Sequence, residues 1–355
     1  MHESLSILFV GYPLLTVSEE SAGGAEQVLL TLEREMSAAG HRTTVAASNG
    51  SRVAGRLLAT GRAVEVLDAY ERREREHCDF VLNYLRRHPG EFDLIHDHSG
   101  SFFRRAGECP PPVLATLHLP RSFYRVEWLQ SAPDNLCFNC VSQTQARSFD
   151  GATTLVHVVE NGIDCERFPL AETKDNYLLW LGRICEEKAP HLSIAAAQRA
   201  GLPLVIAGQV YPFRYHRDYF DREVQPHLFA GSPIRYISGP SFAQKLELLR
   251  HARALLLTST VEETSSLVAM EAMACGTPVV AMHRGAFPEI VSHGETGFVA
   301  DTVEEMVSAL DRVNQISGSE CRFRVQHHFN ARTMAYNYER LYRRVMRQAV
   351  ARVAA

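Results

Sequence analysis

The chain has 355 residues, of which 46% are hydrophobic, so it is long enough for two domains of ordinary size, each with its own core. This composition excludes a disordered or fibrous protein. A formal net charge of −4 and a pI near 6.5 provide no broad basic surface, so nucleic acid is not expected as the main partner.

The first apolar run, residues 5–15, is predicted to form a strand followed by a turn. No Lys or Arg precedes this run, and it contains Gly11 and Pro13, so a strand and turn fit it better than a signal peptide does. No uninterrupted apolar run approaches about 18 residues, the length of a membrane-spanning helix. We therefore expect a soluble, cytoplasmic protein.

Strand-like and helical segments alternate through the first half, a rhythm typical of a parallel α/β sheet. The expected strands are residues 6–10, 43–47, 63–66, 94–96, 113–117 and 137–142. The helix expected over residues 25–39 begins just after Gly23 and Gly24 and ends at Gly40. Its start is therefore a site where backbone amides could meet a ligand at the carboxyl end of a strand.

Eight cysteines are scattered along the chain, and only Cys137 and Cys140 form a CxxC pair. No second CxxC and no nearby pair of histidines complete a zinc motif. We interpret the cysteines as structural thiols, with a redox or metal role as the alternative.

Residues 158–169 are predicted to connect the two halves, because an apolar strand, an Asn161-Gly162 turn and Pro169 follow one another there. Beyond them, strands are expected over residues 177–181, 204–207, 234–237, 254–259 and 279–281. The predicted fold class is therefore α/β, with two Rossmann-like sheets. A site shared by the halves would occupy the cleft between them.

Glu271 is a lone carboxylate inside an almost uniformly apolar helix that follows a polar loop, EETSS. A buried carboxylate needs a polar partner, since leaving it unpaired costs several kcal/mol. The loop supplies Glu263 together with hydroxyls and amides where an anion would dock against a helix N-terminus. In the alternative interpretation Ser265 or Ser266 merely caps the helix, Glu263 balances its dipole, and Glu271 pairs with an Arg or Lys.

The closing segment, residues 330–355, is Arg-rich and carries Tyr, Leu, Val and Met at helical spacing. This pattern favours a docking helix with a basic outer face. A helix lying on a membrane surface is the alternative, so any membrane contact is expected to be peripheral.

Four segments resemble the family 4 glycosyltransferases of the GT-B fold, in the order usual for that family. They read GGAEQVLLTLEREMSAAGH, LGRICEEKAPHLSIAAA, GLPLVIAGQV and EETSSLVAMEAMACGTPVVAMHRGAFPEIVSHGETGFV. The second half is most similar to the branch that contains the avilamycin glycosyltransferase. The resemblance implies an acceptor-side Rossmann-like domain over residues 1–166, a nucleotide-sugar domain over residues 167–335, and a helix over residues 336–355 that returns to the first domain.

The resemblance also implies roles for four charged residues. Arg183 and Lys188 match an Arg and a Lys that bind the donor diphosphate, and two cations there would offset the negative charge that builds on the leaving group. Glu271 matches a carboxylate that accepts hydrogen bonds from the donor ribose. Glu263 matches one that contacts the transferred sugar. In the alternative interpretation the two cations pair with the glutamates between them in a surface loop.

Three residues at the start of the same helix are implied to meet the donor phosphates through their backbone amides, namely Ser265, Ser266 and Leu267. One departure from the family pattern lies here, because Thr264, Ser265 and Ser266 stand where Pro, Phe and Gly are usual. Hydroxyls add phosphate donors, while the loss of the glycine restricts the backbone. The donor sugar is therefore not predicted.

In the first half, Gly23 and Gly24 are implied to let the backbone approach the donor closely. His118, directly after a strand, corresponds to a family histidine at the sugar, with a purely structural histidine as the alternative. The acceptor would be met by loops over residues 99–107 and 120–128, whose arginines and aromatic rings suit an anionic or ring-bearing molecule.

The reaction implied by the resemblance is transfer of a sugar from a nucleotide-diphosphate donor to an acceptor, a small molecule, glycan or glycolipid, with retention of anomeric configuration. The family proposal is front-face attack with the leaving phosphate as base. The chain has no Asp-x-Asp metal motif, so we expect neither a catalytic metal nor a cofactor.

Three other functions use a similar architecture or nucleotide recognition. A nicotinamide-dependent dehydrogenase lacks support because no G-x-G-x-x-G joins the first strand and helix. A nucleotide-sugar epimerase of the same architecture stays open, as does a binding or scaffold paralogue that keeps donor recognition without transfer. The Thr-Ser-Ser replacement is the observation that keeps the scaffold possibility open.

Overall fold

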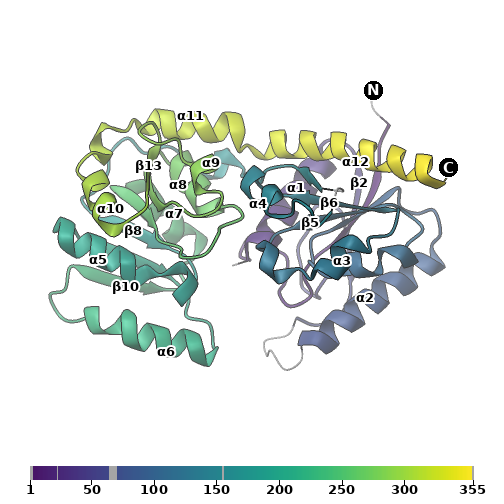
Figure 1. Ribbon diagram of the computed structural model, residues 1–355, viewed down its shortest axis with the longest axis horizontal. Coiled ribbons are helices and arrows are strands. Elements are labelled where there is room, and N and C mark those ends of the chain that lie inside the picture. The colour runs from purple at the N-terminus through teal and green to yellow at the C-terminus, as the bar shows by residue number, and fades with distance from the viewer. Residues whose placement is uncertain (1–2, 22, 64–69, 154–155, 354–355) are drawn as a thin grey trace. The chain divides into compact units, whose positions relative to one another are not determined.

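In a computed structural model, which describes residues 3–21, 23–63, 70–153 and 156–353, the chain divides into two compact units. Unit 1 consists of Met1–Gly162 and Ala331–Ala355, and unit 2 consists of Ile163–Asn330. Each unit is built on its own parallel sheet with helices packed against it (Figure 1). The predicted α/β class with two Rossmann-like sheets is confirmed.

The sheet of unit 1 has seven parallel strands in the order β3-β2-β1-β4-β5-β6-β7. They are β1 (Ser6–Val10), β2 (Arg42–Ala47), β3 (Arg56–Ala59), β4 (Leu94–Asp97), β5 (Val113–Leu117), β6 (Leu136–Cys140) and β7 (Val156–Val158). The helices of the unit are α1 (Gly24–Ala38), α2 (Tyr70–Arg87), α3 (Val126–Gln130), α4 (Gln143–Ser148) and α12 (Ala331–Val353). Long buried runs such as SILFV of β1 form the centre, as expected for strands covered on both faces.

Strand β3 is a difference from the sequence analysis, which expected a strand at residues 63–66. Residues 64–66 lie outside the described residues. Among the described residues, the strand at Arg56–Ala59 pairs with β2 alone, and its four side chains are exposed or half-buried. An edge strand of this length lacks the long apolar run by which central strands are recognised.

The C-terminal helix α12 packs on unit 1, in agreement with the predicted docking helix. Its Tyr338 hydroxyl lies 3.1 Å from the hydroxyl of Thr116 on β5 and accepts a 3.0 Å hydrogen bond from Asn139 on β6. Tyr342 is equally buried, and its hydroxyl lies 2.8 Å from Nδ1 of His96. Within the part of the chain that the structure describes, no helix is both long and apolar enough to cross a membrane.

The sheet of unit 2 has six parallel strands in the order β10-β9-β8-β11-β12-β13. They are β8 (Leu178–Leu181), β9 (Leu204–Gly208), β10 (Ile234–Ser238), β11 (Ala254–Leu257), β12 (Val279–Met282) and β13 (Gly297–Ala300). The helices are α5 (Pro190–Ala200), α6 (Arg214–Glu223), α7 (Phe242–His251), α8 (Leu267–Ala274), α9 (Phe287–Ile290), α10 (Val303–Leu310) and α11 (Gly318–His328). Strand β13 was not predicted from the sequence.

Two neighbouring strands at the centre of this sheet decide where a site can form. β8 and β11 are parallel, with Leu178 opposite Ala254 and Trp180 opposite Leu256. Their carboxyl ends therefore lie side by side at one edge of the sheet. The loops that leave these ends, residues 182–189 and 258–266, carry Arg183, Lys188 and Glu263, whereas Glu271 lies on α8, which follows the second loop. This edge is where open parallel sheets bind ligands.

Candidate active site

The loop after β8 is held in one conformation by the loop after β11. Ala189 is buried and has a left-handed backbone, with φ 46° and ψ 53°, an arrangement that costs a non-glycine residue about 1–2 kcal/mol. The hydroxyl of Thr258 lies 2.8 Å from the carbonyl oxygen of Ala189 and 3.2 Å from that of Lys188. The amide of Thr260 donates to the carbonyl of Glu187 at 2.9 Å. These contacts position Lys188 directly beside the loop that follows β11.

Lys188 and Glu263 form the ion pair that joins the two loops. The ammonium of Lys188 donates to Oε1 of Glu263 at 2.5 Å, and the hydroxyl of Ser259 donates to the same oxygen. The Glu263 side chain is 10% exposed, whereas that of Lys188 is 34% exposed. Glu263 is thus held from one side, while Lys188 remains open to a ligand.

The backbone of Glu263 is fixed by a third loop, which follows β12. Its carbonyl accepts a 2.7 Å hydrogen bond from the amide of Ala286, and the amide of Gly285 donates to the carboxylate of Glu262 at 2.5 Å. Gly285 has φ +56°, and a Cβ at this position would lie 2.1 Å from the carbonyl oxygen of Glu263. Only glycine fits here. Gly285 lies within one of the segments that resemble the family, but its sequence context predicted no role for it.

The start of α8 supports the capping alternative for one serine. The hydroxyl of Ser266 accepts from the amide of Ala269 at 3.3 Å, which caps the helix. The hydroxyl of Ser265 is buried and has no hydrogen-bond partner among the described residues. The first-turn amides of α8, beginning at Leu267, have no partner within the helix itself. The hydroxyl of Ser265 and the amides of Leu267 and Val268, which precede the capped amide of Ala269, are therefore the donors that this helix start can offer to an anion.

The two carboxylate oxygens of Glu271 differ in their hydrogen bonding. It is 3% exposed, and its Oε1 accepts a 2.8 Å hydrogen bond from the ammonium of Lys245 on α7. Its second oxygen, Oε2, is buried without a partner among the described residues. The alternative in which Glu271 pairs with a lysine is thus correct for one oxygen. The other oxygen still has the capacity to accept a hydrogen bond, which a buried carboxylate needs.

Arg183 leaves the end of β8 on the same loop as Lys188. Its side chain is exposed, and its guanidinium carbon lies 5.8 Å from the ring centre of Tyr211. It takes no part in the core of unit 2. The structure thus brings Lys188 and Glu263 into contact and places Arg183 on the same loop, with Glu271 on the helix that follows.

In unit 1, His118 belongs to a row of buried or half-buried histidines. Its Nε2 lies 3.0 Å from Nδ1 of His98, whose Nε2 lies 3.2 Å from Nδ1 of His96. Burial lowers the pKa of His118 to about 4. The pKa of His96 and that of His98 also lie well below the usual value, mainly because the rings are buried and secondly because other histidines lie nearby. All three rings are therefore neutral at pH 7. His96 and His98 were not predicted as site residues, although they flank Asp97 as an HDH tripeptide at the end of strand β4.

The glycine pair of unit 1 has a local explanation. Gly24 opens α1, and the carboxylate of Glu26 folds back over Gly23, where a Cβ would lie 1.9 Å from Oε2. Glu26 is 4% exposed, and burial raises its pKa. A side chain at position 23 would displace the carboxylate of Glu26, so the absence of a side chain at Gly23 allows Glu26 to take this conformation. A role for Gly23 and Gly24 in donor approach stays a prediction.

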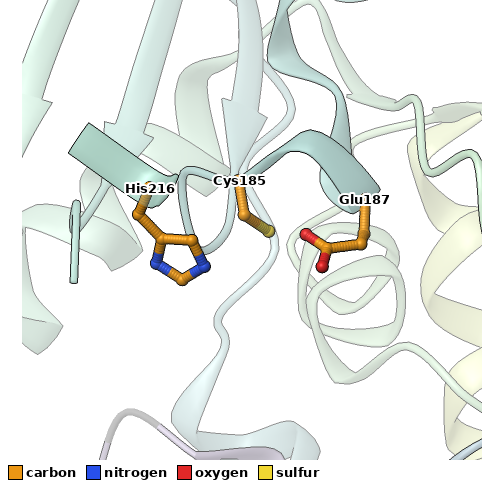
Figure 2. Close-up of side chains that lie close together, drawn as sticks. All are labelled: Cys185, Glu187 and His216. Carbon is orange, nitrogen blue, oxygen red and sulfur yellow. The ribbon is translucent and has the colours of Figure 1, made fainter. Parts of the chain in front are cut away.

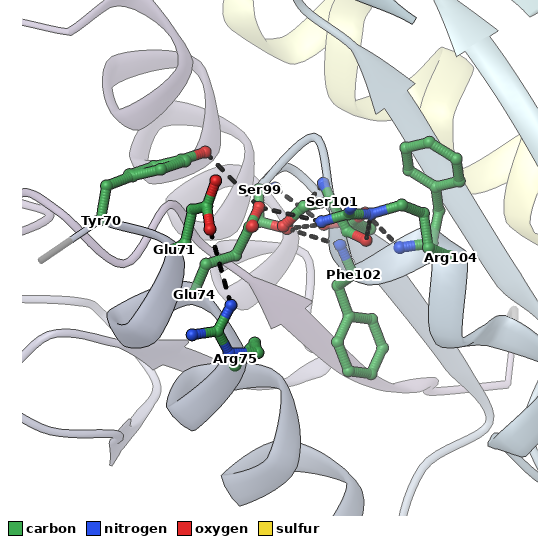
Figure 3. Close-up of polar contacts among 10 residues, drawn as sticks. Tyr70, Glu71, Glu74, Arg75, Ser99, Ser101, Phe102 and Arg104 are labelled. Carbon is green, nitrogen blue, oxygen red and sulfur yellow. Dashed lines mark hydrogen bonds and ion pairs between the residues drawn. The ribbon is translucent and has the colours of Figure 1, made fainter. Parts of the chain in front are cut away.

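The expected acceptor loops are more internally paired than the sequence suggested. Figure 3 shows Glu74 of α2 turned toward Arg104, with which it forms a 3.1 Å ion pair, while Ser99 accepts a 3.0 Å hydrogen bond from the amide of Phe102. Arg104 also lies 4.9 Å from the ring centre of Trp128. Phe123, by contrast, is 63% exposed. Aromatic surface is therefore more available to a ligand here than the charge of Arg104.

Comparison with known families gives matches to both units. The family profile described as "Glycosyl transferases group 1" matches residues 163–333, and the profile described as "Glycosyltransferase Family 4" matches residues 22–167. The glycogen synthase of Mycobacterium tuberculosis (strain CDC 1551 / Oshkosh) is 31% identical over 212 residues. That match covers 52% of this chain and 50% of the relative, so the chain spans only about half the length of this relative.

Solved structures with the same fold cover nearly the whole chain. One is AviGT4, a glycosyltransferase of avilamycin A biosynthesis, with a TM-score of 0.72 and 22% identity over 96% of this chain and 98% of the other. Another is HepE of Anabaena in complex with UDP and glucose, with a TM-score of 0.73 and 17% identity over 95% of this chain and 99% of the other. At these identities the likeness is one of fold, and this applies equally to the avilamycin branch.

Proposed function

We propose, from the premise that this chain belongs to the family 4 glycosyltransferases of the GT-B fold, that it uses a nucleotide-diphosphate sugar as donor and retains the anomeric configuration. The single observation that carries the proposal is the pairing of Lys188 with Glu263. It lies at the carboxyl ends of the two adjacent central strands of a Rossmann-like sheet. A cation and a carboxylate at this edge match two adjacent parts of such a donor, the diphosphate and the sugar.

The diphosphate would be bound by Lys188 and Arg183. Lys188 is one-third exposed and already held beside the site, so its ammonium can turn from Glu263 to a phosphate oxygen with little loss of conformational freedom. Arg183 offers a planar fork on an exposed side chain of the same loop. The first-turn amides of α8 and the Ser265 hydroxyl add neutral donors. Together they would stabilise the charge that develops on the leaving diphosphate.

The nucleoside and the sugar would be bound by the two glutamates. Oε2 of Glu271 lacks a partner among the described residues, so a ribose hydroxyl can donate to it while Lys245 keeps Oε1. Once Lys188 turns to the phosphate, Oε1 of Glu263 can accept a hydrogen bond from a sugar hydroxyl. Its backbone stays fixed by Ala286 throughout.

In the transfer step, the bond between the anomeric carbon and the phosphate oxygen breaks, and a bond from the acceptor oxygen to that carbon forms on the same face. The acceptor proton passes to the leaving phosphate. The protein groups named above supply charge stabilisation and positioning, and none of them forms a bond to the sugar. Because these protein groups already stabilise the charge on the leaving diphosphate, the mechanism needs no divalent metal, and added Mg²⁺ should leave turnover unchanged.

A two-step experiment tests this function. A thermal-shift screen with UDP, ADP, GDP and TDP and their glucose conjugates comes first, and we expect one nucleotide series to stabilise the chain. The best donor is then incubated with water and a panel of acceptors, and the anomeric configuration of the product is read by NMR. Retained configuration without added Mg²⁺ supports the proposal. Inverted configuration, a requirement for Mg²⁺, or an epimerised donor formed without acceptor would each contradict it.

A further inference from the structure

Three side chains of unit 2 outside the proposed donor contacts converge on one point. They are Cys185 in the loop after β8, Glu187 in the 3-10 helix Glu186–Lys188, and His216 in α6. Their sulfur, carboxylate and ring-nitrogen atoms all lie within 4.8 Å of one another. Figure 2 shows the Cys185 side chain between the ring of His216 and the carboxylate of Glu187. Among the described residues this is the one group of three or more side chains that could hold a metal ion.

His216 is the observation that points to a ligand. Its side chain is 1% exposed, yet neither ring nitrogen has a hydrogen-bond partner among the described residues. One oxygen of Glu187, Oε2, is likewise buried without a partner. Buried polar atoms left unsatisfied each cost about 1–3 kcal/mol, so the protein should supply them with a partner. A cation between them would satisfy the imidazole and the carboxylate together.

Three aromatic rings pack around His216 and hold its imidazole beside Cys185 and Glu187. The ring centre lies 4.3 Å from that of Tyr215, 5.3 Å from that of Phe213 and 5.9 Å from that of Tyr211. An apolar ring would suit such a cluster as well as an imidazole does. The presence of two nitrogens that the cluster does not use is therefore best explained by a function of the nitrogens.

From this geometry we propose that Cys185, Glu187 and His216 bind a zinc ion. The donor set of one sulfur, one nitrogen and one oxygen excludes Mg²⁺ and Ca²⁺, which take oxygen ligands, and fits a borderline ion such as Zn²⁺. Donor atoms around a tetrahedral zinc lie roughly 3.3–3.7 Å apart, so the side chains need to close by up to about 1.5 Å. Water would complete the shell.

Charge balance is compatible with this ion. Burial raises the pKa of the Cys185 thiol, while the nearby Arg183 lowers it, and a bound metal ion removes the thiol proton directly. Zn²⁺ with a thiolate and a carboxylate is neutral overall. The positive charge of Arg183 would then meet no net repulsion from the site, and the loop would keep its cationic character.

The role of the ion would be structural and separate from sugar transfer. It would tie the loop that carries Arg183 and Lys188 to α6, an element that follows the next strand along the chain. Zinc would thus limit the motion of the loop without entering the reaction. This assignment stands on the geometry of the three ligands and does not depend on the proposed donor.

The test uses the full chain, stripped of metal by a chelator and kept reduced without added thiols. Titration with Co²⁺ should produce a thiolate-to-cobalt charge-transfer band that saturates at one equivalent, and Zn²⁺ should abolish the band by displacement. Zn²⁺ should also raise the melting temperature of the stripped protein, whereas Mg²⁺ should not. Failure of the stripped protein to give the band would overturn the proposal.

Three variants define the ligands. Cys185→Ser should lose the band, and His216→Phe, which keeps an aromatic ring in the cluster, should weaken Co²⁺ binding at least tenfold. Cys165→Ser, which alters another buried cysteine of unit 2, should bind like the original chain. Stripped His216→Phe should melt no lower than the stripped original chain, which shows that it folds. A band retained in both ligand variants would refute the site. The cobalt readout is independent of nucleotide binding, so this failure and that of the proposed function are separable.

Discussion

Replacement of Gly285 by alanine tests how Glu263 is positioned. The added methyl group meets the carbonyl oxygen of Glu263 at 2.1 Å and its amide nitrogen at 2.4 Å, so the loop that carries Glu263 has to move. The left-handed backbone at φ +56° adds about 1–2 kcal/mol of strain. Loss of the hydrogen bond from Ala286 to Glu263 adds about 0.5–1.5 kcal/mol. The free energy of unfolding should therefore fall by about 2–3 kcal/mol.

A matched control separates strain from displacement. Gly294 also has a left-handed backbone, with φ +84°, but a Cβ there meets no atom within 4 Å. Gly294→Ala should therefore lose only about 1 kcal/mol. In a unit of this size, about 1 kcal/mol lowers the melting temperature by roughly 2–4 °C, so we expect a decrease of roughly 5–10 °C for Gly285→Ala and roughly 2–4 °C for the control.

The assay combines thermal unfolding with release of nucleoside diphosphate from the best donor. A displacement of Glu263 by about 1 Å should lower turnover about 100-fold in Gly285→Ala, whereas Gly294→Ala should keep turnover within about twofold. Both are measured at a temperature where each variant is folded. If Gly285→Ala turned over the donor as fast as the control, Glu263 would not be the residue that this loop positions for catalysis.

Three further predictions concern charge. Arg183→Ala should lower turnover about 100-fold. Because the side chain is exposed, the free energy of unfolding in urea should stay within about 0.5 kcal/mol of that of the original chain. A matching loss of stability would speak against a role in the reaction. Glu271→Ala removes the carboxylate that pairs with the ammonium of Lys245, whose side chain is 17% exposed, so the free energy of unfolding should fall by about 3 kcal/mol. The double variant Glu271→Ala with Lys245→Met should regain most of this stability. A double variant as unstable as the single one would contradict the pairing. His118 is neutral in the folded chain down to pH about 4, whereas the unfolded state binds its proton from about pH 6.5. Stability should therefore fall as the pH drops from 7 to 5, by about 2 kcal/mol more than in His118→Gln, and equal pH slopes would refute this.

The order of elements could be predicted from the sequence because central parallel strands are buried on both faces and appear as apolar runs. The run over residues 254–259 contains β11, and the glycine after the first long helix pattern marks the end of α1. Strand β13, at Gly297–Ala300, has four residues and begins with a glycine, so no apolar run identifies it. Its place is determined by pairing with β12, which sequence pattern does not reveal.

The candidate site could be predicted as a set of residues but not as a set of contacts. Lys188 and Glu263 meet because β8 and β11 are neighbours, and neighbouring parallel strands bring their following loops to the same edge. Lys245, the partner of Glu271, lies on a different helix, and nothing in its local sequence marks it. The role of Gly285 is equally hidden in the sequence, because glycine is needed there to avoid a clash with the backbone of Glu263 and not for its own turn alone.

The histidines of unit 1 show the same limit. His118 could be singled out by its place after a strand, but its pKa and orientation depend on His98 and His96, which come from the neighbouring strand β4 and the residues after it. The burial that makes these rings neutral results from tertiary packing, including that of α12.

A crystal structure of the chain with the nucleotide sugar that stabilises it most would test the central claim most directly. We predict that the diphosphate contacts Arg183 and Lys188, that a ribose hydroxyl donates to Oε2 of Glu271, and that Glu263 lies within hydrogen-bonding distance of the sugar. A nucleotide sugar bound away from the carboxyl ends of β8 and β11, with Lys188 still paired to Glu263, would contradict the account.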